Sequence, residues 1–473
     1  MSAGSSLPPA QDVVESGLAA ARAGSDDCVV IVEETSEVEV RLANNTTTTN
    51  GARRDRRLTV ISLRQTGGGM AAGVARGRGD MDITELVRSA ERDASGSPPA
   101  EDAAPLVDPA AAGVPSQSSR RFDRPPETTD LSVLSGVLSG LSGAFARART
   151  SGRVLAGFAE HRQSTGYLGT STGVRLGHAQ PQGALHLVGR SDDGAGSSWV
   201  GVGTADFTDV SVEELETRVA GRLAWSSRQL ELPAGRYEVI LPPEGVSDLM
   251  VALAYELGGR DAEDGRNAFS RAGGGTRVGD RLTSTPFRLR SDPAEPGLEC
   301  APFVTAASSS ADESVFDNGL PLSRTDWIAS GRLERLRYHR AGAARAGVDP
   351  AGFVANLVLE ADGADGTLEE MVSRTERGLL LTCLWYIREV DPTTMLLTGL
   401  TRDGVYVVED GHVVGAANNF RFNESPVDLL DRATEVGSSV RALGREFGEY
   451  LNRTRMPAMR VPDFNMSTVS RAS

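Results

Sequence analysis

Hydrophobic and polar positions near the N-terminus follow first a helical and then a strand-like period. Apolar residues spaced three and four apart predict a helix over residues 11–23. Two strand-like runs follow at residues 28–33 and 38–42, the second with alternating charges. Residues 44–51 are polar and predict a turn. This opening segment is therefore expected to mix helix and strand.

Glycine and capping residues indicate the next elements. Strand-like residues 58–63 and 70–75 flank the glycines at 67–69, and this arrangement predicts a hairpin. Asp82 is followed by Glu85 three residues later, which is the spacing of a capping box at the start of a helix. The first ninety-four residues are therefore interpreted as one α+β segment.

The middle of the chain repeats this mixture behind a linker. Helical spacing predicts a helix over residues 131–149, and residues 153–202 predict several short strands interrupted by glycine. Ser211 and Glu214 form a second capping box, which predicts a helix that ends near residue 225.

Beyond residue 232 the pattern consists mostly of short strands. Residues 237–241 predict a buried strand, and residues 246–257 predict a helix. The triplet Asp317-Asn318-Gly319 predicts a hairpin turn, two Asp-Gly pairs bracket a strand at residues 405–408, and residues 426–433 predict a short helix.

These elements predict an α+β protein with an N-terminal α+β domain and a β-rich C-terminal domain with short helices. The N-terminal domain is expected to comprise residues 1–94 and 131–232, separated by a Pro/Ser/Ala-rich linker over residues 95–130. The C-terminal domain is expected to cover residues 233–473.

Composition narrows the class of function. The net charge of −15 provides no basic surplus for phosphates, so a nucleic-acid partner is not expected. The N-terminus lacks a signal-peptide pattern, and no apolar run approaches the length of a membrane span. The three cysteines are far apart and form no CxxC pair, which is typical of reduced thiols. A cytoplasmic location without membrane contact is predicted.

Catalytic chemistry is hard to place on this chain. All 49 basic residues are arginine, which excludes Schiff-base, Walker-type and Ser–Lys chemistry. There is no GxSxG elbow, and Cys383 lies in an apolar run typical of a core thiol. The histidines show no zinc-peptidase spacing on a helix, so solvated or locally bonded side chains are predicted at the five positions His161, His178, His186, His339 and His412.

Four segments of the C-terminal half carry a resemblance to a known family. They are the strand at residues 236–242, residues 378–382, the hairpin-like residues 398–411, and the closing residues 456–461. In this order and spacing the chain resembles the TldD/PmbA family, and the N-terminal segment and central linker have the expected order.

The resemblance also implies what the chain lacks. Members of the TldD type carry HExxxH on the helix after the first of these strands, and a cysteine near the C-terminus completes their zinc site. Here the motif falls near Val251, Ala252 and Glu256, and no cysteine follows Cys383. The resemblance is therefore to the PmbA/TldE branch, with no catalytic residue, metal ligand or cofactor expected in this chain.

That branch implies a heterodimer with a TldD-like zinc peptidase subunit. The partner would supply the zinc ion, the activated water and the glutamate. This chain would help to form the peptide channel for proteolysis of unfolded proteins or for removal of a leader peptide.

Two other functions stay open on the sequence alone. The first is a free-standing enzyme that uses acidic pairs or an arginine cluster such as Arg332, Arg335 and Arg337, although that cluster is more typical of a solvated face. The second is an assembly or binding protein with no link to proteolysis.

Overall fold

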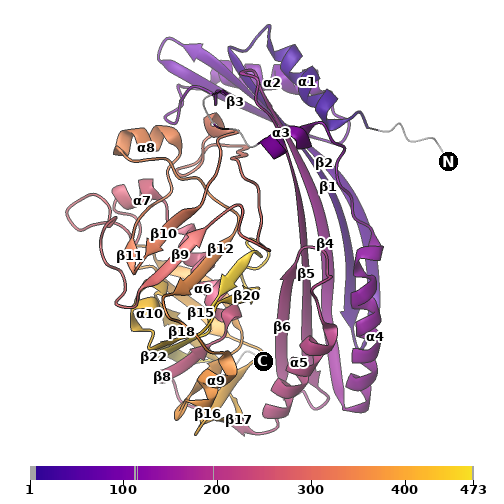
Figure 1. Cartoon of the computed structure of the whole chain (residues 1–473), viewed down its shortest axis with the longest axis vertical. Coiled ribbons are helices and arrows are strands. Elements are labelled where there is room, and N and C mark those ends of the chain that lie inside the picture. The colour runs from indigo at the N-terminus through magenta and orange to yellow at the C-terminus, as the bar shows by residue number, and fades with distance from the viewer. Residues whose placement is uncertain (1–6, 111–112, 114–115, 195, 471–473) are drawn as a thin grey trace, which may run out of the picture.

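The computed structural model describes residues 7–110, 113, 116–194 and 196–470. Figure 1 shows one large sheet with long strands beside a second region of shorter strands and loops. The N-terminal half forms the first region, and the C-terminal half forms the second. The predicted α+β class is confirmed, whereas the predicted domain boundaries stay predictions.

The N-terminal sheet is antiparallel with the order β3-β2-β1-β4-β5-β6. Its strands are β1 (Asp27–Ala43), β2 (Thr46–Thr66), β3 (Gly69–Arg78), β4 (Arg153–Thr170), β5 (Arg175–Ser191) and β6 (Ser197–Thr204). The hairpin predicted around the glycines at 67–69 is confirmed as the β2–β3 connection.

The strands are longer than predicted. The two runs at 28–33 and 38–42 belong to one strand, and the expected turn at 44–51 is limited to Asn44 and Asn45, both with positive φ. Residues 153–202 form three strands and not several short ones. Glycines within these strands do not interrupt them. Their role is to leave room for helices that pack closely against the sheet. A Cβ on Gly189, for example, would lie 2.2 Å from Val219 Cγ1.

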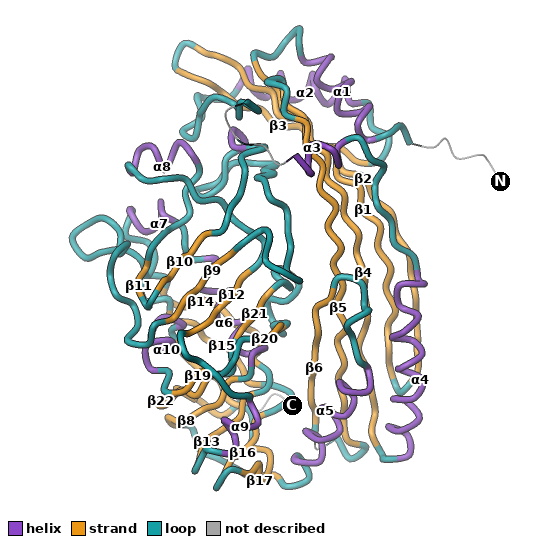
Figure 2. The backbone as a smooth tube through the Cα atoms, in the orientation of Figure 1, coloured by secondary structure: helices purple, strands orange, loops and turns teal. Residues whose placement is uncertain are grey.

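Helices cover one face of this sheet (Figure 2). They are α1 (Ala10–Ala21), α2 (Ile83–Gly96), α3 (Ser116–Phe122), the 3-10 turn η1 (Leu131–Leu134), α4 (Ser135–Thr150) and α5 (Val212–Trp225). Val30 and Val38 of β1 lie on the same pleated face, the first against α1 and α2 and the second against α4 and α5. The predicted N-caps are confirmed, because the side chains of Asp82 and Ser211 accept from the N–H groups of Thr84 and Glu214. The structure shows the reciprocal glutamate bond of a full capping box at neither of these two helices.

The opposite face of the sheet meets the C-terminal half. At one end, Val29 and Ile31 pack against Phe303 and Phe316. Elsewhere Arg445 bridges the two halves, with its guanidinium 5.4 Å from the ring centre of Trp199 on β6 and 4.3 Å from that of Trp385.

Two sheets build the C-terminal half. The smaller has the order β11-β10-β9-β12-β21-β20, and the larger has the order β14-β15-β18-β22-β8-β13-β16-β17-β7 with β19 beside β22. The smaller sheet contains β9 (Phe287–Ser291), β10 (Thr325–Ala329), β11 (Arg332–Leu333), β12 (Leu357–Ala361), β20 (Val440–Ala442) and β21 (Thr454–Met456). The larger sheet contains β7 (Gln229–Leu230), β8 (Gly235–Leu241), β13 (Arg377–Leu381), β14 (Leu384–Asp391), β15 (Leu396–Thr401), β16 (Val405–Glu409), β17 (His412–Ala417), β18 (Phe420–Glu424), β19 (Glu435–Val436) and β22 (Met459–Val469).

Short helices accompany these sheets. They are α6 (Pro243–Tyr255), α7 (Gly259–Glu263), the 3-10 turn η2 (Val315–Asp317), α8 (Arg340–Ala346), α9 (Leu368–Ser373) and α10 (Pro426–Arg432). The largest hydrophobic cluster joins α6 to strands of both sheets. The β-rich pattern is thus confirmed, as are the strand at 405–408 and the helix at 426–433.

The hairpin expected at Asp317-Asn318-Gly319 is wrong. Asp317 ends η2, and the Asn318 side chain bonds the carbonyls of Ala306 and Val315. Here the Asp-Asn-Gly signal closes a loop, because the asparagine satisfies backbone groups that no strand would pair.

One helical stretch, Leu131–Thr150, is long and apolar enough to cross a membrane by length and composition alone. A single such helix is weak evidence. Its residues Val137, Leu141 and Phe145 belong to the hydrophobic cluster shared with α5 and the sheet. The absence of membrane contact stays a prediction.

Candidate functional site

Helix α6 carries two of the three positions singled out from the sequence. Pro243 fills its first turn, where the missing N–H costs nothing, and residues 244–254 are all buried. Val251 is 1% exposed and Ala252 is 9% exposed within the main core. Neither side chain has an atom that can bind a metal or move a proton, so at these positions the helix contributes packing.

Glu256 is the third position and is chemically different. It follows the last turn of α6 and is half-buried. Burial and, after it, the nearby acids Glu389 and Asp261 together raise the pKa of its carboxyl to about 7, against the opposing charge of Arg337. Glu256 can therefore hold or release a proton near neutral pH.

Arg337 connects this end of α6 to an aromatic surface. Its Nη2 donates to the Tyr255 carbonyl at 2.6 Å and to Asp312 Oδ2 at 2.9 Å. The Tyr255 ring is stacked on Phe353 with 6.2 Å between ring centres, and Tyr255 is 41% exposed. The solvated face predicted for the arginine cluster is confirmed for Arg332 and Arg335, which are exposed, and is wrong for Arg337, which these contacts bury.

Asp248, one turn before Val251, escaped the sequence interpretation. It is 1% exposed and accepts hydrogen bonds from the backbone N–H groups of Arg445, Glu446 and Phe447 at 2.9, 3.0 and 2.9 Å. Burial raises its pKa to about 7 in spite of these three bonds. The sequence signal that could have identified Asp248 is the presence of an acidic residue inside an apolar helical run.

The loop held by Asp248 in turn holds strand β14. The Glu446 carboxylate accepts from the Tyr386 N–H at 2.9 Å and from Arg388 Nη1 at 2.7 Å. Among the described residues β14 pairs only with β15, so it forms one edge of the larger sheet. Tyr386 is 55% and Val390 is 57% exposed on this strand. Sequence reasoning missed this edge, because an edge is defined by sheet order and not by local pattern.

The histidines are scattered, and the prediction of locally bonded rings is confirmed for four of the five but is wrong for His186, which is buried and whose Nδ1 has no hydrogen-bond partner in the described structure. Ring nitrogens have hydrogen-bond partners in His161 (Thr129 and Ala205), His178 (Gln180), His339 (Gly342) and His412 (Asp410), while His186 is stacked on Phe158. In the part of the chain that the structure describes, no three His, Cys, Asp or Glu residues form a group that could hold a metal ion.

Cys383 is buried, as its apolar run predicts. Burial raises the pKa of its thiol well above the ordinary value. A thiol that stays protonated is a poor nucleophile, so Cys383 belongs to the core.

Comparisons with known proteins agree with the family resemblance. Residues 234–468 match the PmbA/TldA metallopeptidase C-terminal domain. TldE from Thermococcus kodakarensis has a similar structure, with a TM-score of 0.77 and 16% identity over 96% of this chain and 99% of that one.

Two further solved structures, both described as modulators of DNA gyrase, are similar along their whole length. The protein from Thermotoga maritima has a TM-score of 0.76 and 15% identity over 96% of this chain and 99% of its own. The protein from Bacteroides thetaiotaomicron has a TM-score of 0.72 and 14% identity, with coverage of 97% and 99%. At these identities the likeness concerns the fold. No curated protein matches the sequence.

Proposed function

Because residues 234–468 place this chain in the PmbA/TldD family, we propose that it is the non-catalytic, TldE-type subunit of a heterodimeric zinc metallopeptidase. The partner is a TldD-like subunit that carries zinc, and the complex works in the cytoplasm. This chain holds no cofactor of its own and shapes the channel that receives the peptide.

The observation that carries the proposal is the chemistry of the motif positions. A zinc peptidase needs nitrogen, oxygen or sulfur ligands and a glutamate that activates the metal-bound water. Val251 and Ala252 have hydrocarbon side chains inside the core, and only Glu256 is ionisable. One carboxylate cannot replace two histidines, a cysteine and a separate general base, so these groups come from the partner.

The geometry also supports a role in binding the substrate. An edge strand can pair with an extended peptide through main-chain hydrogen bonds, while alternate side chains select its sequence. Strand β14 is such an edge, with Tyr386 and Val390 exposed on it. Tyr255 and Phe353 add an aromatic surface near the end of α6. An unfolded protein or a leader peptide has the extended backbone that this edge can pair with.

Co-expression with a candidate HExxxH-bearing subunit tests the proposal. We expect the isolated chain to bind no stoichiometric zinc and to cleave no unfolded protein. The purified heterodimer should contain one zinc ion and cleave peptides, and replacing the partner's motif glutamate with glutamine should abolish cleavage.

Zinc-dependent peptidase activity in the isolated chain would contradict the proposal. Activity of the isolated chain that survives a chelator would indicate a free-standing enzyme. Co-purification from the native host with a partner that is not a zinc peptidase would indicate an assembly protein.

A further inference from the structure

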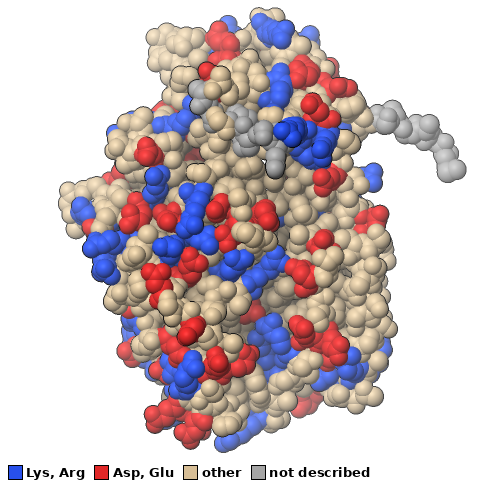
Figure 3. Space-filling model, in the orientation of Figure 1, with Lys and Arg blue, Asp and Glu red and all other residues tan. Residues whose placement is uncertain are grey.

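A small polar cavity lies where the N-terminal sheet meets the C-terminal half. Its volume is about 120 Å³, and its walls come from β5, β6, the loop at residues 297–299, β20 and the segment that precedes β21. Figure 3 shows basic side chains, all of them arginine in this chain, interspersed with acidic ones along the boundary between these two regions. We call it the seam cavity.

Arg453 lines the seam cavity without a counter-ion. Its Nη2 donates to the Pro181 carbonyl at 2.7 Å, and no carboxylate of the described residues lies within ion-pair distance of its guanidinium. Arg453 is partly buried, and this burial lowers the pKa of its guanidinium. Even partial burial of a cation is costly unless an anion compensates its charge.

Neighbouring arginines are compensated, so Arg453 stands apart. Arg441 at the rim of the seam cavity is paired with Asp209 and donates to the Gly297 carbonyl. Arg455, two residues along the chain, is paired with Glu295 at 2.5 Å. Glu299 is the one acidic residue that lines the cavity, and although its charge raises the pKa of Arg453, its carboxylate does not come within ion-pair distance of that guanidinium.

Apart from Arg453, Arg441 and Glu299, the polar groups that line the seam cavity are neutral. Gln180 donates to the Glu299 carbonyl at 3.2 Å, which leaves its oxygen to accept from His178 Nε2 at 3.0 Å. Burial lowers the pKa of His178, and the charge of Arg453 lowers it further, against the hydrogen bond to Gln180. Asn452 is 7% exposed, and its Oδ1 has no hydrogen-bond partner in the described structure.

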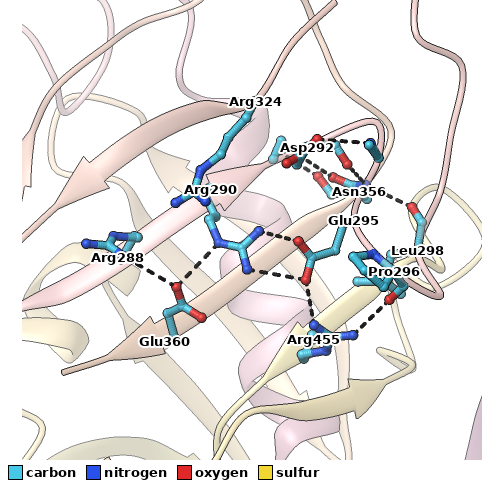
Figure 4. A network of polar contacts seen from close by, with 12 residues as sticks. Arg288, Arg290, Asp292, Glu295, Pro296, Leu298, Arg324, Asn356, Glu360 and Arg455 are labelled. Atoms are coloured by element: carbon cyan, nitrogen blue, oxygen red, sulfur yellow. Dashed lines mark hydrogen bonds and ion pairs between the residues drawn. The ribbon is translucent and has the colours of Figure 1, made fainter. Parts of the chain in front are cut away.

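A network of charged side chains fixes the wall formed by the loop at 297–299 (Figure 4). Glu295 accepts two hydrogen bonds from Arg290 at 2.5 and 3.2 Å and one from Arg455 at 2.5 Å. Asn356 donates to the carbonyls of Asp292 and Leu298 at 2.5 and 2.8 Å. A wall held this way is preorganised, so little conformational entropy is lost when a ligand enters.

We propose that the seam cavity binds a small oxyanion, a carboxylate or phosphate group, for which Arg453 supplies the counter-charge. A guanidinium is the side chain best suited to this, because its N–H groups match the two oxygens of such an anion. The inference does not depend on the peptidase proposal. Two sources share this chemistry: the α-carboxylate of a peptide and inorganic phosphate.

Calorimetric titration of the full isolated chain tests the proposal with three probes: inorganic phosphate, trialanine with a free C-terminus, and amidated trialanine. We expect phosphate or the free-acid peptide to bind, and Arg453→Gln to weaken that binding at least tenfold, which corresponds to about 1.4 kcal/mol. Arg281→Gln is the matched control. Arg281 is exposed and also donates only to a carbonyl, that of Thr283, so binding should be unchanged.

The three probes distinguish the two possible sources of the anion. Binding of the free-acid peptide without binding of its amide identifies a peptide carboxylate, whereas binding of phosphate alone identifies an inorganic anion. No binding of any probe, or equal binding by Arg453→Gln, would overturn the proposal. If Arg453→Gln does not fold, a crystal of the wild-type chain grown with arsenate decides the question, because anomalous scattering locates the anion either at Arg453 or elsewhere. No partner subunit is needed, so failure here is distinct from failure of the heterodimer proposal.

Discussion

Helix α6 and strand β14 lie near each other in the C-terminal half and differ in almost every physical respect. Residues 244–254 of the helix are buried and most of their apolar side chains belong to the main core, whereas the strand is an edge with exposed tyrosine and valine side chains. The loop at residues 445–447 joins them, because Asp248 binds its backbone while Glu446 holds β14. From this comparison we infer that α6 mainly stabilises the fold, whereas β14 presents exposed side chains at the molecular surface.

The largest expected effect comes from a cavity in α6. Leu249 is fully buried in the main core, so Leu249→Ala should lower the free energy of unfolding by about 2–5 kcal/mol. Urea denaturation monitored by circular dichroism measures the loss. Val390→Ala on β14 is the control, and a similar loss in that variant would break the distinction between helix and edge.

An intermediate effect, on the pH dependence of the free energy of unfolding, is expected from Asp248 of α6. In the folded chain burial raises the pKa of Asp248 to about 7, above the value near 3.8 that it has when unfolded. The folded chain therefore keeps a proton that the unfolded chain releases, so this stabilisation is complete below pH 4 and is lost as pH rises through 7. Asp248→Asn should remove a slope of at most about 1.4 kcal/mol per pH unit over this range.

Urea midpoints of both proteins at several pH values between 4 and 8 provide the measurement. Subtracting the variant from the wild type removes the contribution of other titrating groups. Two parallel pH profiles would show that Asp248 stays ionised in the fold, and the interpretation of its burial would then be wrong.

The smallest effect on stability should come from the edge strand. The double variant Tyr386→Ala, Val390→Ala should change the free energy of unfolding by no more than about 0.5 kcal/mol, since both side chains are largely exposed. Peptide cleavage by the assembled heterodimer should nevertheless become less efficient, because the KM for an extended peptide substrate should rise. Unchanged kinetics would show that peptides do not use this edge.

Much of the fold follows from local pattern. The helices capped by Asp82 and Ser211 were predictable because these capping side chains satisfy backbone groups within the same turn. The strands of the N-terminal sheet were predicted too short, because a glycine such as Gly189 looks like a break in sequence. Only the close packing of Val219 against Gly189 shows why a glycine is needed within this strand.

Less of the candidate site could be predicted. The positions near Val251, Ala252 and Glu256 came from a family resemblance and not from the residues themselves. Asp248 and the edge at β14 depend on partners about 200 and 60 residues away along the chain, as the contacts of Arg445 and Glu446 show. Such long-range pairs leave no periodic signal in a single sequence.

The position of Arg445 between Trp199 and Trp385 provides an optical reporter. The two indoles belong to different halves of the molecule and share one cation, so their emission depends on whether the halves stay in contact. With only four tryptophans in the chain, single substitutions can assign the signal. Intrinsic fluorescence can therefore follow any opening between the halves in solution without an added label.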